Sequence, residues 1–344
     1  MISLPAIPPL DVDAPQAALA RQARLTKPAG ALGKLEALSV RLAAMTGRID
    51  WLPTRRAVVV CAGDHGVAAQ GVSAYPQAVT QQMVMNFLRG GAAVNVLARQ
   101  MGARVTIVDA GVAADFEPHP NLIRAKIAPG TADMTLGPAM TLEQADAAVQ
   151  LGQDVLGAEI ERGLDILVVG EMGIGNTTSA SAIIAAITDI DASQVTGRGT
   201  GIDYAQHAHK VRIVNQALRS NYPARDNTLA KVGGFEIGVM AGLMLCAAAA
   251  RVPILVDGLI CTAAAMIAAQ FQPQVVDYMV AAHRSIEPGH GIALSLLGLA
   301  PLLEFDMRLG EGTGALLALP IVEAAMRTLQ EMSTFDDAGV SGPV

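Results

Sequence analysis

The chain has 344 residues, 52% hydrophobic and 16% charged, and its 24 basic and 31 acidic side chains give a formal net charge of −7. This composition excludes a largely disordered protein, and because no basic cluster offsets the acidic balance, we expect no nucleic-acid partner. The longest apolar run, residues 237–250, is shorter than the ~20 residues of a membrane-spanning helix, so we expect no membrane span. The three dispersed cysteines and the lack of a signal peptide pattern indicate a cytoplasmic protein.

Short β-branched runs alternate with longer segments rich in alanine and leucine. Residues 12–50 have helical spacing and no strand pattern. The runs that follow predict strands at residues 57–61, 105–109, 165–169 and 253–257, with weaker candidates at 122–127 and 275–280. The segments between them predict helices at residues 80–99 (interrupted at Gly90-Gly91), 141–156, 177–187, 232–250 and 261–270, and residues 315–333 are helical again.

Continuous apolar strands that alternate with helices are typical of a parallel sheet covered by helices on both faces. We therefore predict an α/β fold, with a large Rossmann-like domain at residues 51–314 that carries the active site. Residues 1–50 and 315–344 are expected to form a small helical domain. In such sheets ligands bind beyond the carboxyl ends of the strands, so the chemistry is expected in the loops that follow them.

The loop after the predicted strand 165–169 is rich in glycine and leads into a helix. Glycines occupy positions 170, 173 and 175, and Asn176, Thr177 and Thr178 follow. Backbone N–H groups at a helix N-terminus bind anions without a basic residue, so this loop is a candidate phosphate site. Glu171 ends the strand and is the charged group expected to face the pocket. The alternative is a purely structural turn capped by Asn176.

Two other loops place acidic groups next to glycines. Asp64 and His65 follow the first strand, where catalytic groups are common, but no nucleophile motif accompanies them, and the alternative for Asp64 is a cap for backbone amides. Glu311 stands between Gly310 and Gly312. It is either a desolvated general base or the N-cap of the helix that follows.

The histidines do not have the spacing of a metal site. His207 and His209 leave a helix in different directions. His283, Glu287 and His290 have helical spacing, but the proline at position 288 is expected to break that helix. We therefore expect no bound metal.

Several long strings of residues resemble one known family in their order and spacing. They lie at residues 26–36, 63–67, 71–76, 79–83, 86–98, 170–181, 197–201, 234–237, 285–290 and 308–315. In these strings the chain is similar to the nicotinate-nucleotide:dimethylbenzimidazole phosphoribosyltransferases, over about residues 20–330. Ala31 departs from the family pattern, in which we expect serine.

The resemblance implies a reaction. Phosphoribose would pass from β-nicotinate mononucleotide to 5,6-dimethylbenzimidazole, giving α-ribazole 5′-phosphate and nicotinate in cobalamin biosynthesis. A pyridinium leaving group departs without pyrophosphate, so no metal or other cofactor is expected. The partners would be these small molecules and a second copy of the chain, in a homodimer whose helices close each other's sites.

The resemblance also implies roles for single residues. Glu311 matches the general base, and Glu171 and Lys210 match polar groups of the active site. Without the resemblance, Lys210 would be interpreted as an exposed helix lysine. The implied substrate-binding positions are Ser73, Tyr75, Gln81, Gly173, Gly175, Asn176, Thr177, Thr178, Gly199, Thr200, Gly201, Leu309 and Gly310.

Two alternatives stay open. One is a catalytically inactive protein that binds nicotinate mononucleotide. The other is a related glycosyl-transfer or nucleotide-hydrolysing enzyme with another acceptor. The acceptor base itself is not fixed by the sequence, because bases that differ by a few methyl groups differ in binding by only ~1–3 kcal/mol.

Overall fold

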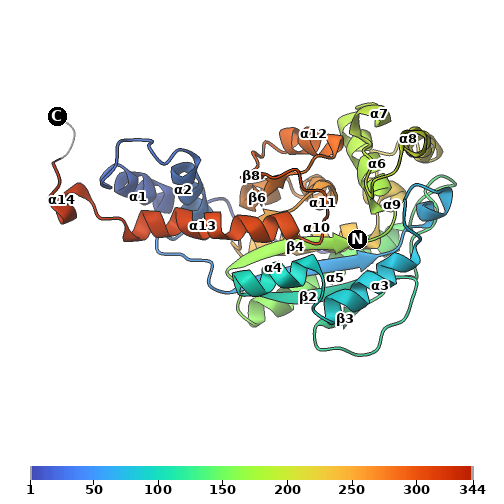
Figure 1. The fold of residues 1–344 in the computed structure, drawn as a ribbon, viewed down its shortest axis with the longest axis horizontal. Coiled ribbons are helices and arrows are strands. Elements are labelled where there is room, and N and C mark those ends of the chain that lie inside the picture. The colour runs from blue at the N-terminus through green and yellow to red at the C-terminus, as the bar shows by residue number, and fades with distance from the viewer. Residues whose placement is uncertain (1, 342–344) are drawn as a thin grey trace.

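A six-stranded parallel sheet forms the centre of the computed structural model, which describes residues 2–341 (Figure 1). β1 (Arg56–Gly63) lies between β2 (Ala103–Gly111) and β4 (Ile166–Met172), and the full order is β3-β2-β1-β4-β5-β6. The remaining strands are short: β3 (Leu122–Arg124), β5 (Ile254–Val256) and β6 (Met279–Ala281). The order reverses between β1 and β4, and such a reversal places a ligand cleft beyond the carboxyl ends of these strands.

Most of the predicted strands are confirmed. The apolar runs of β1 and β4 are buried along nearly their whole length, as expected of strands covered on both faces. The prediction of a strand over residues 275–280 is wrong for most of that range. Residues Pro273–Tyr278 form a 3-10 helix, and β6 begins only at Met279.

The predicted helices are present, and the structure adds others. Gly90 and Gly91 separate the first two of them, as expected. The predicted helices are α3 (Ala78–Leu88), α4 (Ala93–Met101), α5 (Leu142–Glu161), α6 (Asn176–Thr188), α10 (Phe235–Ala249), α11 (Leu259–Phe271) and α13 (Thr313–Glu331). Further elements are the 3-10 turn Gly66–Gln70, α7 (Ala192–Val195), α8 (Tyr204–Ser220), α9 (Thr228–Val232), α12 (Pro288–Leu296) and the pair β7 (His283–Arg284) and β8 (Leu303–Glu304).

Glycine allows the helices that cover the sheet to pack closely. α5 and α10 meet at Gly152 and Gly242. A Cβ atom on Gly152 would lie 2.0 Å from the carbonyl oxygen of Val239, and one on Gly242 would lie 1.9 Å from that of Val149. The high glycine content therefore serves backbone contact between helices as well as turns.

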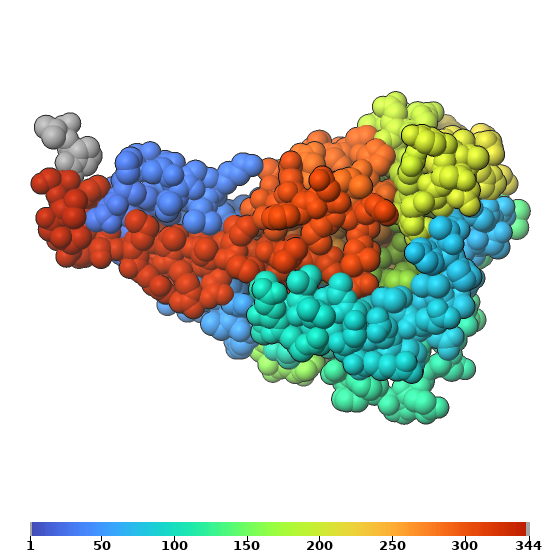
Figure 2. Space-filling model, in the orientation of Figure 1, coloured from blue at the N-terminus to red at the C-terminus, as the bar shows by residue number. Residues whose placement is uncertain are grey.

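A group of helices lies to one side of the sheet. α1 (Asp13–Gln22), α2 (Lys34–Thr46) and α14 (Phe335–Ala338) gather around the far end of α13 (Figures 1 and 2). Arg21 fixes this arrangement by donating to the carbonyl oxygens of Leu329 and Gln330 at 2.5 and 2.7 Å. The division into two domains stays a prediction, since α13 contacts both this group and the strands. Within residues 2–341, no helix combines the length and apolar character needed to cross a membrane.

Candidate active site

The glycine loop between β4 and α6 brings Glu171 and Asn176 together. Glu171 is the next-to-last residue of β4, and its Oε2 accepts a hydrogen bond from the Asn176 side chain. Gly175 has φ +99°, a left-handed conformation that favours glycine, and it precedes the first residue of α6. The loop therefore turns sharply enough to point a carboxyl group and an amide toward the same space.

Several amides of this loop already have partners within the protein. The Asn176 and Thr178 N–H groups donate to the carbonyl oxygens of Gly173 and Gly175 at 3.1 and 2.9 Å. The N–H of Ile174 donates to the Thr80 hydroxyl at 3.0 Å. An anion here has fewer free amides than the glycine spacing alone predicts, so side-chain donors gain importance.

A second glycine loop, residues 197–201, lies opposite the first. The cationic side chains of Lys210 and Arg308 lie beside it. Lys210 of α8 is fully buried, and its Nζ donates to the Thr177 hydroxyl at 2.8 Å. Arg308 donates to the carbonyl oxygen of Gly199 at 2.8 Å. Burial lowers the pKa of Lys210 to about 8, and the negative charge of Glu287 opposes this shift. Lys210 is therefore charged at neutral pH.

Glu311 has an unusual backbone conformation and a buried side chain. Its φ is +62°, uncommon for a residue with a side chain. The residue is 4% exposed, and its Oε2 accepts the N–H of Val94 in the first turn of α4 at 3.2 Å. Burial raises the pKa of Glu311, the Val94 hydrogen bond opposes this, and nearby Asp257 adds to it.

Asp257, not Glu311, caps α13. Its two carboxylate oxygens accept the N–H groups of Gly312 and Ala315 at 3.2 and 2.9 Å. No side chain caps α13 from Gly312, the residue before its first turn. The capping alternative considered for Glu311 is therefore wrong for the helix that follows it, and its carboxyl group caps α4 instead.

Burial and neighbouring acidic groups raise the pKa of Glu171. Burial raises the pKa of Glu171 to about 8, and Asp257, Glu236 and Glu311 contribute in the same direction. The hydrogen bond from Asn176 opposes this shift. Glu171 is therefore protonated at neutral pH in the unliganded site.

A cavity of about 500 Å³ opens where these loops meet. Its polar lining comes from the loops after β4, before α8, before α12 and before α13. Its apolar lining comes mainly from α3, α11 and the loop after β4. The lining residues are Tyr75, Val79, Met83, Glu171, Met172, Gly173, Ile174, Asn176, Thr177, Gly199, Thr200, Gly258, Leu259, Ile260, His283, Ser285, Glu287, Arg308, Leu309, Gly310 and Glu311. One cavity thus offers both charged groups and an apolar surface for a flat ring.

The structure places most of the predicted site residues on this cavity. Those that line it are Tyr75, Glu171, Gly173, Asn176, Thr177, Gly199, Thr200, Leu309, Gly310 and Glu311. Lys210 lies behind Thr177, and Ser73 contacts the Thr200 hydroxyl at 3.3 Å. The remaining positions, Gly175, Thr178, Gly201 and the exposed Gln81, are not on its wall.

Asp64 and His65 have structural partners. Asp64 accepts the N–H of Ala113 at 2.8 Å, as its interpretation as a cap for backbone amides predicts. His65 Nε2 lies 2.6 Å from Glu236, and both side chains are almost fully buried. Neither Asp64 nor His65 lines the cavity.

Part of the site has no recognisable pattern in the sequence. His283, Ser285 and Glu287 line the cavity, although the sequence suggested only a poor metal site there. Pro288 begins α12 at its first position and His283 lies in β7, so no single helix carries His283, Glu287 and His290, as expected. The sequence signal that could have identified this part of the site is the resemblance of residues 285–290 to the family. Among residues 2–341, no group of three or more His, Cys, Asp or Glu side chains could hold a metal ion.

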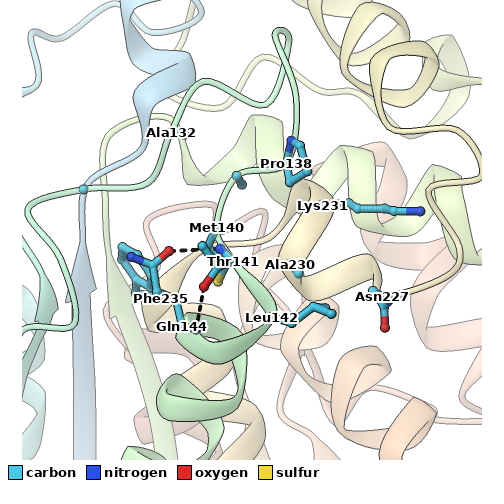
Figure 3. A pocket seen from close by; sticks show the side chains of 12 residues that line it. Ala132, Pro138, Met140, Thr141, Leu142, Gln144, Asn227, Ala230, Lys231 and Phe235 are labelled. Carbon is cyan, nitrogen blue, oxygen red and sulfur yellow. Dashed lines mark hydrogen bonds between the residues drawn. The ribbon is translucent and has the colours of Figure 1, made fainter.

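A second cavity, of about 580 Å³, lies between the loop before α5 and α9 (Figure 3). Three of its polar side chains have partners in the protein. Thr141 and Gln144 hydrogen-bond to each other, and Lys231 donates to the carbonyl oxygen of Pro223 at 2.7 Å. None of the predicted site residues lines this cavity. We therefore place the chemistry in the first cavity.

Comparison with known proteins gives consistent matches over almost the whole chain. A family model described as phosphoribosyltransferase matches residues 7–340. A nicotinate-nucleotide–dimethylbenzimidazole phosphoribosyltransferase of Chloroflexus aurantiacus is 56% identical over 98% of this chain and 97% of its own. A protein of the same name from Desulforudis audaxviator is 54% identical over 97% of this chain and 96% of its own. A crystal structure of such an enzyme from Thermus thermophilus matches with a TM-score of 0.93 at 44% identity, covering 97% of this chain and all of that one.

Proposed function

Because the chain belongs to the nicotinate-nucleotide–dimethylbenzimidazole phosphoribosyltransferases, we propose that it transfers the phosphoribosyl group of nicotinate mononucleotide to 5,6-dimethylbenzimidazole. The products are α-ribazole 5′-phosphate and nicotinate, in the assembly of the nucleotide loop of cobalamin. The observation that carries the proposal within the site is the Glu311 carboxyl group, which lies on the wall of a cavity that also holds a glycine loop and an apolar surface.

The phosphate binds between the two glycine loops. Lys210 and Arg308 supply positive charge there, and Thr177 and Asn176 supply side-chain donors. Free amides of the loop after β4 complete the site. Lys210 carries its charge below a pH of about 8, so binding of the phosphate weakens above that pH.

The acceptor base lies against the apolar lining, and Glu311 takes its proton. A ring nitrogen of the benzimidazole forms the new bond to C1′ of the ribose, while the bond from C1′ to the pyridine nitrogen breaks. Nicotinate leaves with the electron pair of that bond. The proton on the other ring nitrogen of the benzimidazole passes to Glu311, whose burial-raised pKa makes it a better base. Attack opposite the leaving group inverts C1′ from β to α.

Glu171 has a supporting role in the unliganded site. It is protonated at neutral pH and holds the Asn176 side chain in place. As a catalytic group it acts only after losing its proton, for example to stabilise positive charge on the ribose ring as nicotinate leaves.

The reaction needs no metal, and the protein works as a homodimer in the cytoplasm. The metal-free chemistry follows from the pyridinium leaving group, which carries its own positive charge. The homodimer follows the family resemblance and agrees with apolar side chains exposed beside the cavity, such as Leu309 at 59%. The cytoplasmic location agrees with three cysteines that are free thiols.

The test is product analysis with purified protein. With both substrates, we expect α-ribazole 5′-phosphate and nicotinate in equal amounts, and activity unchanged by a chelator. Release of nicotinate without the acceptor, giving ribose 5-phosphate, would identify a hydrolase instead. Binding of nicotinate mononucleotide without turnover would identify an inactive binding protein. Competition between benzimidazoles, adenine and phenolic acceptors would define the natural acceptor.

A further inference from the structure

The first turn of α4 takes its cap from the active site. The residue at the cap position is Ala92, which has no side-chain oxygen to offer the amides of that turn. The N–H of Val94 donates instead to Oε2 of Glu311 at 3.2 Å, although the two residues are 217 positions apart in the chain. The cap of α4 is therefore the carboxyl group that the proposed function uses as the general base.

Asn95 fixes this turn from within. It is the third residue of α4 and is 6% exposed. Its Oδ1 accepts the N–H of Ala92 at 3.2 Å, and its Nδ2 donates to the carbonyl oxygen of Phe87, in the last turn of α3, at 3.0 Å. One buried side chain thus joins the end of α3 to the start of α4 and sets the direction of the Val94 N–H.

Close backbone packing holds both partners of the contact. Gly90, between α3 and α4, has φ +78°, a conformation that favours glycine, and its carbonyl oxygen accepts from Arg99 at 2.9 Å. A Cβ atom on Gly170 of β4 would lie 2.4 Å from the carbonyl oxygen of Glu311. The backbone of Glu311 therefore lies directly on the sheet, and the turn that faces it is tied down on its own side.

Charged groups surround Glu311 on the other elements packed there. Asp257, after β5, and Glu171, at the end of β4, are acidic. Arg308 belongs to the same loop as Glu311, and His283 of β7 lies 3.3 Å from Asp257. Burial raises the pKa of Glu311, the hydrogen bond from α4 opposes this shift, and Asp257 adds to it. Because a base must be deprotonated before it accepts a proton, the amide of α4 favours the form that catalysis needs.

We propose that Asn95 is a positioning residue for Glu311, because it holds the first turn of α4 so that the Val94 N–H stays on the carboxylate. The proposal rests on the proposed function and gives a role in it to a residue that does not line the cavity. The competing explanation is that Asn95 only stabilises the turn between two helices. In that case its loss affects turnover by the same factor whatever residue stands at position 311.

The experiment is a double-mutant cycle between positions 95 and 311. The kcat, the Kd of nicotinate mononucleotide and the melting temperature are measured for the wild type, Asn95→Ala, Glu311→Gln and the double variant. We expect Asn95→Ala to lower kcat about 3- to 100-fold, the range for coupled residues of one hydrogen-bond network, and to leave the Kd nearly unchanged. In the Glu311→Gln background the same substitution should change kcat by less than about twofold.

Gln144→Ala is the matched control. Gln144 is likewise the third residue of its helix, α5, and its side chain accepts the N–H of the cap residue Thr141 at 2.9 Å. We expect this variant to lose stability and to keep the wild-type kcat. Asn95→Ser, a smaller change, takes the place of Asn95→Ala in every comparison if the alanine variant does not fold.

A second readout does not use turnover. The ionisation of Glu311 is followed through the NMR signal of its carboxyl carbon, which is assigned by its absence from Glu311→Gln. Weakening a hydrogen bond to the charged form raises the pKa of a carboxyl group. Glu311 should therefore titrate at a higher pH in Asn95→Ala than in the wild type, and at the wild-type pH in Gln144→Ala.

Two results would overturn the proposal. One is an equal fall in kcat when Asn95→Ala is introduced into the wild type and into Glu311→Gln, which is the outcome of a purely structural role. The other is a Glu311 carboxyl group that titrates at the same pH in Asn95→Ala and in the wild type. A wild-type protein without turnover would disprove the proposed function, and the titration would still decide whether Asn95 positions Glu311.

Discussion

Glu171 and Lys210 reach similar pKa values from opposite directions. Burial raises the pKa of the carboxyl group to about 8 and lowers that of the ammonium group to about 8. At neutral pH the carboxyl group is neutral while the lysine is charged. The empty site is therefore less negative than its acidic residues suggest, which suits a ligand that carries a phosphate.

Replacing Glu171 with glutamine should stabilise the protein more at high pH than at low pH. In the unfolded chain this carboxyl group loses its proton near 4.5, but in the folded protein only near 8. Between these values the folded state binds more protons, so stability falls as the pH rises. Glutamine does not titrate, so the variant does not lose stability in this way as the pH rises. Its melting temperature should therefore exceed that of the wild type by more at pH 8.5 than at pH 5. An equal difference at both pH values would show that the Glu171 pKa is not raised.

Replacing Glu311 with glutamine should lower turnover about 10²- to 10⁴-fold, the contribution of a positioned general base. Glutamine keeps an oxygen that can accept the Val94 N–H, so the fold and the binding of nicotinate mononucleotide should persist. The measurements are kcat, the nucleotide Kd and the melting temperature, with Glu161→Gln as the control. Near wild-type turnover in a stable variant would remove Glu311 from this role and make Glu171 the next candidate.

Some residues of the site are predictable from the sequence, and others are not. Glu171 and Glu311 were found because each stands in a glycine loop after an apolar run. Lys210 alone is indistinguishable from a solvent-exposed helix lysine, and only tertiary packing buries it. His283 and Glu287 reach the cavity through the strand β7 and the turn before α12, which have no periodic pattern of their own.

At the scale of elements, the start of α13 connects the sheet to the catalytic loop. Asp257 follows β5, and its carboxylate accepts N–H groups of Gly312 and Ala315. These contacts hold the residue that follows Glu311. The long apolar strands and amphipathic helices were predictable from periodicity, whereas this cap joins residues far apart in the sequence and has no local signal.

Removing this cap should therefore affect both stability and catalysis. Asp257→Ala loses a helix cap, which typically costs about 0.5–2 kcal/mol of stability, and leaves Glu311 less firmly placed. Thr141→Ala is the matched control, because Thr141 caps α5 by accepting the Gln144 N–H at 3.1 Å on the exposed surface, and α5 carries none of the site residues. We expect similar losses in denaturant midpoint but a fall in kcat of at least tenfold only for Asp257→Ala. Equal activity in the two variants would contradict the positioning role.

At the scale of the whole molecule, apolar side chains near the cavity are left exposed. Phe305 is 65% exposed and Leu309 is 59% exposed, and both belong to the segment between β8 and α13. Exposed apolar side chains next to a functional cavity are typical of a surface that another chain covers. The second copy that the family resemblance implies is the occupant we expect.

The protein should sediment as two chains of 35.5 kDa, and its activity per chain should fall on dilution below the dimer dissociation constant. Phe305→Glu should shift the equilibrium toward the monomer and lower activity. Leu136→Glu, at an 81% exposed position in the loop before α5, should do neither. A wild-type protein that is monomeric and fully active would disprove the homodimer.

α13 extends from the catalytic loop to the helices at the other side of the molecule. It has 19 residues, a rod of about 28 Å at 1.5 Å per residue. Tilting such a rod by about 2° moves one end by about 1 Å, and a misplacement of that size can change a rate about 100-fold. The packing of α1 and α2 against α13 therefore contributes to the placement of Glu311, so a substitution in that interface should lower turnover without touching the substrate.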